Sequence, residues 1–297
     1  MALYRSLKLL AAAALALASV APALAQPRPR TILFIGNSFT QGAHSALRNW
    51  RANSVIDLNR DGYGGVPALF KFFTEEVGLN YAVSLETQGG QTLGFHYDER
   101  RQLFERAWDV VVLQEYSTLD RERPGDPRGY VRDVPRLAAL FRGYNPAVQL
   151  ELMATWSRAD ETYRPRGHWY GKPVTAMALD LRVAADRARA ATRGPVGILP
   201  VGEAWNRAIA TGVADANPYD GVPFGRLDLW SYDQYHASIY GYYLEALIVF
   251  GRITGVDPLT LGKDEHAADE LGLSPAQASA LQRVAHDQLA AETRPRR

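Results

Sequence analysis

The sequence contains no cysteine among its 297 residues. This absence excludes disulfide bonds, a cysteine nucleophile, thiolate metal ligands and the lipid-modified cysteine of a lipoprotein. The stability of the fold must therefore come from the burial of apolar side chains. Hydrophobic residues make up 47% of the chain, which is enough for one large domain with a substantial core.

The chain also lacks an excess of either positive or negative charge. The chain has 33 basic and 32 acidic residues, and so even a balance predicts no electrostatic affinity for nucleic acid or for an anionic membrane. Beyond residue 25, no stretch is long and apolar enough to span a bilayer. A small molecule or a carbohydrate as the partner is compatible with this balance, and the sequence leaves the oligomeric state open.

Residues 1–25 have the pattern of a signal peptide. Arg5 and Lys8 precede an alanine-rich apolar run that ends in Ala23-Leu24-Ala25, a small-x-small cleavage pattern. Cleavage there would change the formal charge from +1 to −1. An uncleaved membrane anchor is the alternative, but the run is short and is broken by Pro22. The expected location is the periplasm or the extracellular space.

Short runs rich in β-branched residues alternate with segments of helical period. This alternation predicts a parallel sheet of five strands between two layers of helices, within a single domain over residues 26–297. The expected strands are 31–36, 81–87, 109–114, 148–154 and 196–201. The expected helices are 41–50, 66–77, 98–107, 129–143, 174–192, 203–211 and 237–253. A helical extension follows from about residue 256, with a surface helix within 264–292 and a helix start at Ser274-Pro275.

Ligands of open parallel sheets bind outside the carboxyl ends of the strands. In this chain, Asn37 and Ser38 follow the first expected strand. A serine at this position becomes a nucleophile only if a base takes its proton. The segment DLWSYDQYHAS supplies Asp233 and His236, whose spacing of three places both side chains on one side of the chain. We therefore expect Ser38, His236 and Asp233 to act as nucleophile, base and orienting acid.

Donors for a tetrahedral oxyanion are expected from the same edge of the sheet. Gly89 and Gly90 follow the second strand, Gln114 ends the third, and Ser38 adds its own backbone N–H at the predicted helix start. Each feature has a simpler explanation: a helix N-cap for Ser38, a surface ion pair for Asp233 and His236, a tight turn for the two glycines and a satisfied polar residue for Gln114. Their occurrence together, in this order, favours catalysis.

At these positions the chain resembles the SGNH (GDSL-like) hydrolases, over about residues 31–254. FIGNSFTQG is similar to the serine block of the family, Gly89-Gly90 to the glycine block and Asp233-x-x-His236 to the last block. The resemblance implies a flavodoxin-like three-layer α/β/α fold and ester hydrolysis that needs neither a cofactor nor a metal. It also implies an oxyanion hole made by Ser38, Gly90 and Gln114, with Gly89 as the alternative to Gly90.

Two blocks depart from the family pattern. The serine block reads Gly-Asn-Ser-Phe instead of Gly-Asp-Ser-Leu, and Gln114 stands where the third block usually has an asparagine. Glutamine carries the same amide on a longer stem, so it can serve only if the strand ends slightly further back. The combination resembles a separate branch of the superfamily, to which knowledge of substrates transfers poorly.

Four further residues are candidates for substrate contact. They are Gly89 and His96 near the glycine block, and Trp156 and Trp169 in a long loop after the fourth strand. The aromatic residues of that loop could equally pack it onto the domain, and His44 is expected to be structural or exposed. The predicted function is an exported serine esterase that removes O-acetyl or other short acyl groups from a carbohydrate. The alternatives are an esterase for longer acyl chains, acyl transfer, and a non-catalytic binding protein on the same scaffold.

Overall fold

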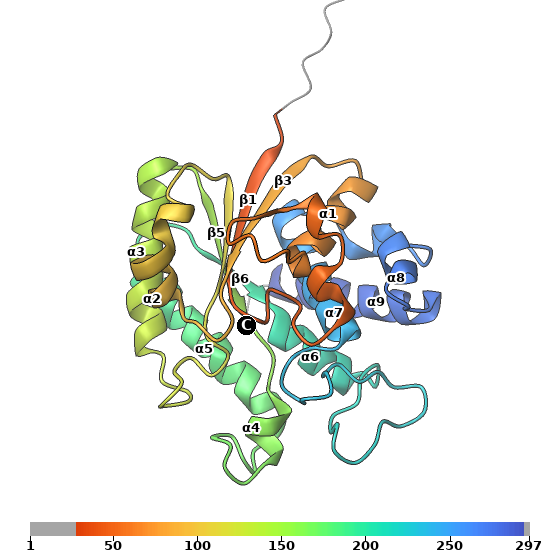
Figure 1. The fold of residues 1–297 in the computed structure, drawn as a ribbon. Coiled ribbons are helices and arrows are strands. Elements are labelled where there is room, and N and C mark those ends of the chain that lie inside the picture. The colour runs from red at the N-terminus through yellow and green to blue at the C-terminus, as the bar shows by residue number, and fades with distance from the viewer. Residues whose placement is uncertain (1–27, 294–297) are drawn as a thin grey trace, which may run out of the picture.

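The computed structural model describes residues 28–293 of the chain (Figure 1). The expected signal peptide, residues 1–25, lies outside the described residues. Within the described part, no helix is long and apolar enough to cross a membrane.

A parallel sheet forms the centre of the fold, in the order β2-β3-β1-β4-β5-β6. The five strands that the sequence predicts are all present, but the prediction of five strands is wrong because the sheet has a sixth. The additional strand β2 contains two residues at the edge of the sheet, which is too short to show an alternating pattern. The strands are β1 (Arg30–Gly36), β2 (Ile56–Asp57), β3 (Tyr81–Thr87), β4 (Val110–Gln114), β5 (Gln149–Ala154) and β6 (Gly197–Pro200).

Helices cover both faces of the sheet (Figure 1). One layer contains α1, α6, α7, α8 and α9, and the other contains α2, α3 and α5. The helices are α1 (Gly65–Glu76), α2 (Leu93–Phe95), α3 (Arg128–Tyr144), α4 (Ala159–Tyr163), α5 (Thr175–Ala191), α6 (Val201–Ala210), α7 (Ile239–Thr254), α8 (His266–Glu270) and α9 (Pro275–Thr293). Short 3-10 turns occupy Ala46–Asn49, Ala52–Ser54, Arg101–Leu103 and Pro258–Leu261, and a π-helical turn occupies His96–Arg100.

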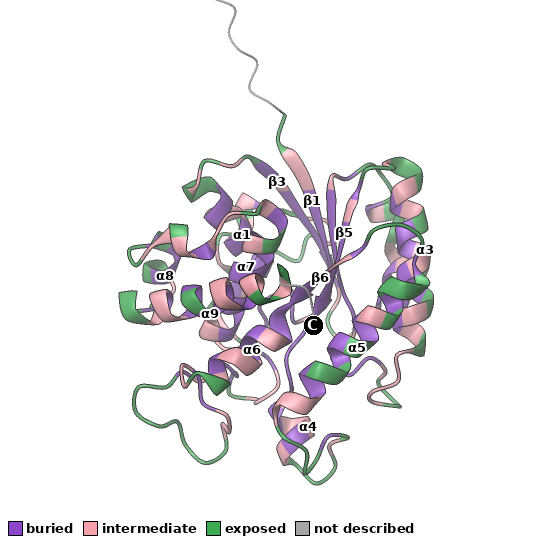
Figure 2. Ribbon diagram, turned by 180° about the vertical axis from the view of Figure 1, so that it is seen from behind, coloured by how far each residue is buried: buried purple, intermediate pink, exposed green. Residues whose placement is uncertain are grey.

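Strand β1 shows why the sequence forms this three-layer arrangement. Ile32 and Phe34 pack into the core on the α1/α7 side, whereas Leu33 and Ile35 pack into the core on the α3/α5 side. All four side chains are fully buried, and Figure 2 shows that most of the central strands are buried as well. A parallel strand that is covered on both faces therefore reads as a continuous apolar run.

Three of the expected helices differ from the structure. The expected helix 41–50 is absent because Gly42 and His44 have φ angles of 68° and 62°, in the left-handed region, which ends a right-handed helix. The expected helix 98–107 is replaced by the π and 3-10 turns. The tail helix divides at Gly272 (φ 80°) into α8 and α9, and Ser274 caps α9 in front of Pro275.

The topology places a ligand crevice at the end of β1. The chain passes from β1 to β3 on one side and later to β4 on the other, so the strand order reverses at β1. Without the edge strand β2, the order β3-β1-β4-β5-β6 matches that of flavodoxin-like sheets. The loops that leave β1, β3 and β4 therefore meet at one edge of the sheet, where the sequence places its candidate residues.

Candidate active site

Ser38 lies two residues beyond β1, in a loop that folds back on itself. Gln41 N–H donates to Asn37 O (3.0 Å) and Ala43 N–H donates to Ser38 O (3.1 Å). The strand ends in Gly36 because a Cβ atom there would clash with the side chains of Thr40 and Gln114. The missing side chain thus allows the loop to close tightly over the sheet and leaves Ser38 half-buried at its edge.

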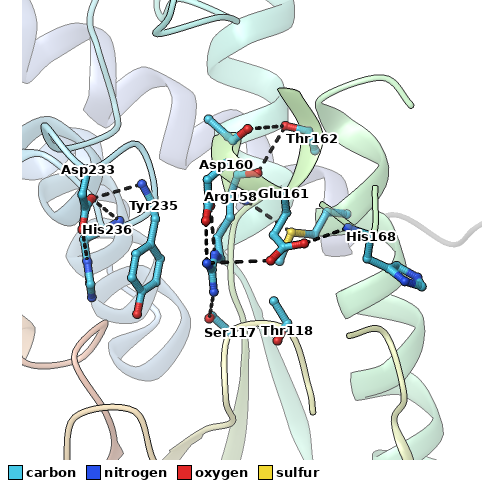
Figure 3. A network of polar contacts seen from close by, with 12 residues as sticks. Ser117, Thr118, Arg158, Asp160, Glu161, Thr162, His168, Asp233, Tyr235 and His236 are labelled. Carbon is cyan, nitrogen blue, oxygen red and sulfur yellow. Dashed lines mark hydrogen bonds and ion pairs between the residues drawn. The ribbon is translucent and has the colours of Figure 1, made fainter. Parts of the chain in front are cut away.

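The structure brings Ser38, His236 and Asp233 together, although Ser38 and His236 are 198 residues apart in the sequence. Nε2 of His236 lies 2.9 Å from Ser38 Oγ, and Nδ1 lies 2.6 Å from Asp233 Oδ2. The second carboxylate oxygen of Asp233 accepts the backbone N–H groups of Tyr235 (3.1 Å) and His236 (2.9 Å). The D-x-x-H spacing therefore forms a closed loop that fixes the acid against the base (Figure 3).

The electrostatics of this pair suit a general base. Burial alone would raise the pKa of Asp233, but hydrogen bonds from the His236 ring and from two backbone N–H groups hold it at about 2. Burial lowers the pKa of His236, and the contact with Asp233 opposes this effect. At neutral pH, the imidazole is therefore neutral and can take the proton of Ser38, while the carboxylate stays ionised.

A buried aromatic stack joins the loop that carries Ser38 to the loop that carries His236. Trp156 lies between Phe39 (4.3 Å between ring centroids) and Trp205 (4.7 Å). Its indole N–H donates to Tyr235 O (3.1 Å). Phe39 follows Ser38 and Tyr235 precedes His236, so one tryptophan positions both of these loops.

The loops after β1 and β3 contain backbone N–H groups that could serve as oxyanion donors. In the described part of the chain, no protein acceptor takes the N–H groups of Ser38, Gly89 or Gly90. Gly90 has φ 70°, a conformation that favours glycine, and its carbonyl accepts Arg121 Nη2 (2.6 Å). Asn37 Nδ2 donates to Gln91 O (3.0 Å), which ties the glycine loop to the serine loop. The preference for Gly90 over Gly89 as an oxyanion donor stays a prediction.

Gln114 does not occupy the position that the sequence analysis gives it. Its side-chain oxygen accepts Asn37 N–H (2.9 Å) and Thr40 Oγ1–H (3.0 Å), and its NH2 group donates to Glu115 O. The side chain is fully buried, so its amide supports the serine loop from below instead of pointing at the oxyanion. The longer stem of glutamine reaches across beneath Gly36, which has no side chain to block it.

Three of the four residues expected to contact substrate are buried. His96, Trp156 and Trp169 each have an exposed fraction of 0%. His96 pairs with Glu86, and the Trp169 indole donates to Asp180 (2.8 Å). These side chains pack the loops onto the domain, which is the alternative that the sequence left open. Gly89 alone among the four is exposed.

The structure adds site residues that the sequence analysis did not select. The ring of His44 stacks on that of His236 (4.3 Å between centroids), and His44 Nδ1 contacts Tyr232 OH at 2.5 Å. Tyr232 is 75% exposed at the rim of the site. The ring of Tyr235 also packs against His236 (3.8 Å between centroids) and contacts Arg158. Both tyrosines belong to the segment DLWSYDQYHAS, but only the fold gives His44 and Arg158 a role.

His44, Asp233 and His236 also form the one group of described residues whose ligand atoms could approach a metal, all within 4.8 Å of one another. The two imidazole rings stack with an interplanar angle of 27°. Both ring nitrogens of His236 are already in hydrogen-bonding contact, Nδ1 with Asp233 and Nε2 with Ser38. This geometry favours an acid–base pair with a supporting ring over a metal centre.

Glu115, directly after Gln114, is an acid buried beside the site. Its Oε1 accepts the N–H groups of Leu93 (3.2 Å) and Tyr116 (2.7 Å), while Oε2 has no partner among the described residues. Burial raises the pKa of Glu115 to about 8. The carboxyl group is therefore protonated at neutral pH and adds no negative charge next to the serine loop.

No protein family and no curated protein matches the chain by sequence. Solved structures do match its fold. A DUF4886 family protein from Bacteroides uniformis shares 18% identity with a TM-score of 0.59, covering 91% of this chain and 98% of that one. A candidate GDSL-like lipase from Parabacteroides merdae shares 18% identity with a TM-score of 0.50, covering 77% and 96%. These similarities place the chain in the same α/β fold, with a parallel sheet flanked by helices.

The pH dependence of turnover should reflect the buried imidazole. Because burial lowers the pKa of His236, kcat/KM for an ester should reach half of its maximum below the reference value for histidine, about 6.5. Initial rates between pH 4 and 9 measure this midpoint. A midpoint at or above the reference value would contradict the described environment of His236.

Gln114→Ala should destabilise the protein. The substitution leaves Asn37 N–H without its acceptor and opens a cavity beneath the serine loop, so the free energy of unfolding should fall by about 2–4 kcal/mol. Urea denaturation followed by circular dichroism measures the change. Unchanged stability combined with a drop in kcat of about 100-fold or more would instead return Gln114 to the oxyanion hole.

Glu115→Gln should stabilise the protein at alkaline pH. Between about pH 4.5 and 8, the folded protein holds a proton on Glu115 that the unfolded chain has lost, so wild-type stability declines as the pH rises through this range. Glutamine stays neutral, and the variant should gain on the order of a few kcal/mol at pH 8 but little at pH 4.5. Thermal unfolding at both pH values tests this, with the exposed Glu122→Gln as control. An equal effect at both pH values would contradict the raised pKa.

Proposed function

We propose that the protein is an exported serine esterase of the SGNH superfamily that removes short acyl groups, foremost acetyl, from a carbohydrate hydroxyl. The observation that carries the proposal is the hydrogen-bonded chain from Ser38 Oγ through His236 to Asp233, beside free backbone donors. The assignment to the superfamily rests on the sequence blocks, and the fold is compatible with it.

The chemistry follows from this arrangement. Ser38 Oγ attacks the ester carbonyl while His236 Nε2 takes its proton, and the N–H groups of Ser38 and Gly90 hold the oxyanion. The imidazolium then returns the proton to the leaving alcohol. Water, deprotonated by the same imidazole, hydrolyses the acyl-Ser38 intermediate. Asp233 stays ionised and holds the ring throughout.

The expected substrate class rests on the rim of the site and on the leader sequence. With Trp156 and Trp169 buried, the exposed aromatic surface beside the catalytic histidine comes from Tyr232 and His44, which offers a face for a sugar ring. The signal-peptide pattern of residues 1–25 is the basis for export. A longer acyl chain is the second candidate, because the P. merdae protein of similar fold is named as a GDSL-like lipase.

Turnover of p-nitrophenyl esters from acetate to octanoate, together with acetate release from acetylated oligosaccharides, tests the proposal. The acetate ester and the acetylated oligosaccharide should be the preferred substrates. Ser38→Ala should abolish turnover, whereas Ser54→Ala, whose hydroxyl makes no hydrogen bond among the described residues, should retain it. A preference for octanoate would favour the lipase-like alternative, and the absence of any Ser38-dependent turnover would favour a binding protein.

A further inference from the structure

A cavity of about 530 Å³ without an assigned role adjoins the glycine loop (residues 88–92). Its wall is formed by Thr92, by the first turns of α3 and by the loop that follows β4. Arg121 on this wall donates from Nη2 to Gly90 O (2.6 Å), and Thr92 is only two residues beyond Gly90. Two residues span at most about 7 Å of chain. The cavity therefore borders on a candidate oxyanion donor.

The protein itself fixes the part of the wall that follows β4. Asp120 Oδ1 accepts the N–H groups of Glu122 (2.9 Å) and Arg123 (2.8 Å), and Asp120 O accepts the hydroxyl of Thr118 (2.9 Å). Leu119, which also lines the cavity, has φ 69°, a left-handed conformation that a bulky residue adopts only where its surroundings impose it. A wall that is already in place lowers the ordering cost of binding a ligand.

Charges of both signs line the cavity and nearly balance. The wall contains four arginines and, besides the protonated Glu115, three acids. Two of the arginines already have close carboxylate partners, since Arg132 pairs with Asp133 (2.6 Å) and Arg128 with Asp126 (2.6 Å). This balance favours neither an anion nor a cation as the occupant. An apolar acyl chain in the cavity would desolvate these charged groups at a cost.

Hydrogen-bonding groups of both kinds remain unused in the cavity. Arg121 forms no ion pair with a described residue, and Arg123 approaches carboxylates only at 3.5 Å. The carboxylate of Glu122 is exposed and accepts no hydrogen bond from the described part of the chain. Glu115, which is 5% exposed, leaves its Oε2 without a partner among the described residues. Hydroxyl groups both donate and accept, so a ligand rich in hydroxyls matches this lining.

The cavity and the exposed rings of His44 and Tyr232 belong to different layers of the fold. The cavity lies beside α2 and α3, whereas His44 precedes α1 and Tyr232 precedes α7 in the opposite layer (Figure 1). Ser38 follows β1, at the edge of the sheet between the two layers. A chain of sugar rings that contacts both surfaces therefore crosses Ser38.

We propose that this cavity is a second sugar-binding subsite, which holds a neighbouring ring of the substrate through its hydroxyl groups. Arg121 and Arg123 donate to the hydroxyl oxygens, and the carboxylate of Glu122 accepts from the hydroxyl hydrogens. The inference rests on the proposed esterase function and deepens it, because the substrate is then an acetylated oligosaccharide or polysaccharide and not a single sugar. Since Arg121 also holds Gly90 O, a bound ring contacts the segment that supplies an oxyanion N–H.

Gly129→Leu tests the proposal by filling the cavity. Gly129 lines the cavity in the first turn of α3, and a Cβ atom there would have no heavy atom within 4 Å, so leucine enters open space in a helix that tolerates it. Gly143→Leu is the matched control, because Gly143 has equally open surroundings at the other end of α3 and does not line the cavity. The measurement is kcat/KM for acetylated xylose, xylotriose, mannose and mannotriose.

The readout is the ratio of kcat/KM for a trisaccharide to that for its monosaccharide, in which a general loss of activity cancels. The wild type should show a ratio of about 10 or more in at least one of the two series, as two or three net hydrogen bonds would give. Gly129→Leu should lower this ratio to about one, and Arg123→Ala should lower it about threefold or more. Gly143→Leu should keep the wild-type ratio.

The outcomes separate this inference from the proposed function. A wild-type ratio near one in both series, or a ratio that persists in Gly129→Leu or falls equally in Gly143→Leu, would overturn the subsite. Wild-type protein that hydrolyses p-nitrophenyl acetate through Ser38 but none of the acetylated sugars would overturn it too, and in all these cases the esterase activity stands. A wild type that hydrolyses none of the esters contradicts the esterase function, and the subsite falls with it.

Discussion

The site depends on one packing constraint, the stack of Phe39, Trp156 and Trp205 in the core beneath it. Phe39 follows the nucleophile, and the indole N–H of Trp156 holds the backbone next to the catalytic histidine. Proton transfer between Ser38 and His236 needs a separation of about 3 Å. Aromatic rings in contact, fixed by a hydrogen bond, hold two distant loops to such a tolerance more reliably than an exposed loop contact could.

Around this stack, the polar groups have separate tasks. Asp233 holds the imidazole, and the rings of His44 and Tyr235 pack against it. Arg158 in turn lies over the ring of Tyr235. Gln114 braces the serine loop with its side-chain oxygen and donates its NH2 group to Glu115 O, so the backbone N–H groups are left as the candidate oxyanion donors. The protonated carboxyl of Glu115 is close by without opposing negative charge at that position. Under the proposed function, the site concentrates hydrogen-bond donors where charge would develop during ester cleavage.

The sequence predicts the layers of the fold and the edge at which the candidate residues meet, because apolar strands and the residues that follow them are local features. It misses β2, whose two residues carry no period, and it extends a helix through residues 41–50, where Gly42 and His44 take left-handed conformations. The D-x-x-H spacing predicts the acid–base pair because it is local too. The orientation of Gln114 is not local, since it depends on the space that Gly36 leaves across the sheet.

Dependence on distant parts of the chain also explains why the sequence could not decide between binding and packing for the aromatic residues. Trp156 and Trp169 lie in a long loop next to the crevice, and their composition suits a binding surface as well as a packed one. Only the fold shows that the loop turns inward and buries both, while Tyr232 on another segment provides the exposed ring. Arg158 belongs to the same loop as the two tryptophans, and its contacts with Ser117 and Tyr235 require the loops after β4, β5 and α6 to meet. The spacing of residues in the sequence does not reveal contacts between three separate loops.

The central claim is that Ser38 is an activated nucleophile, and the site of covalent modification by a fluorophosphonate tests it most directly. Peptide mapping of the treated protein by mass spectrometry should find one adduct, on Ser38, and replacement of His236 by glutamine should slow its formation strongly. An untouched Ser38, or modification at another serine with equal ease, would contradict the account.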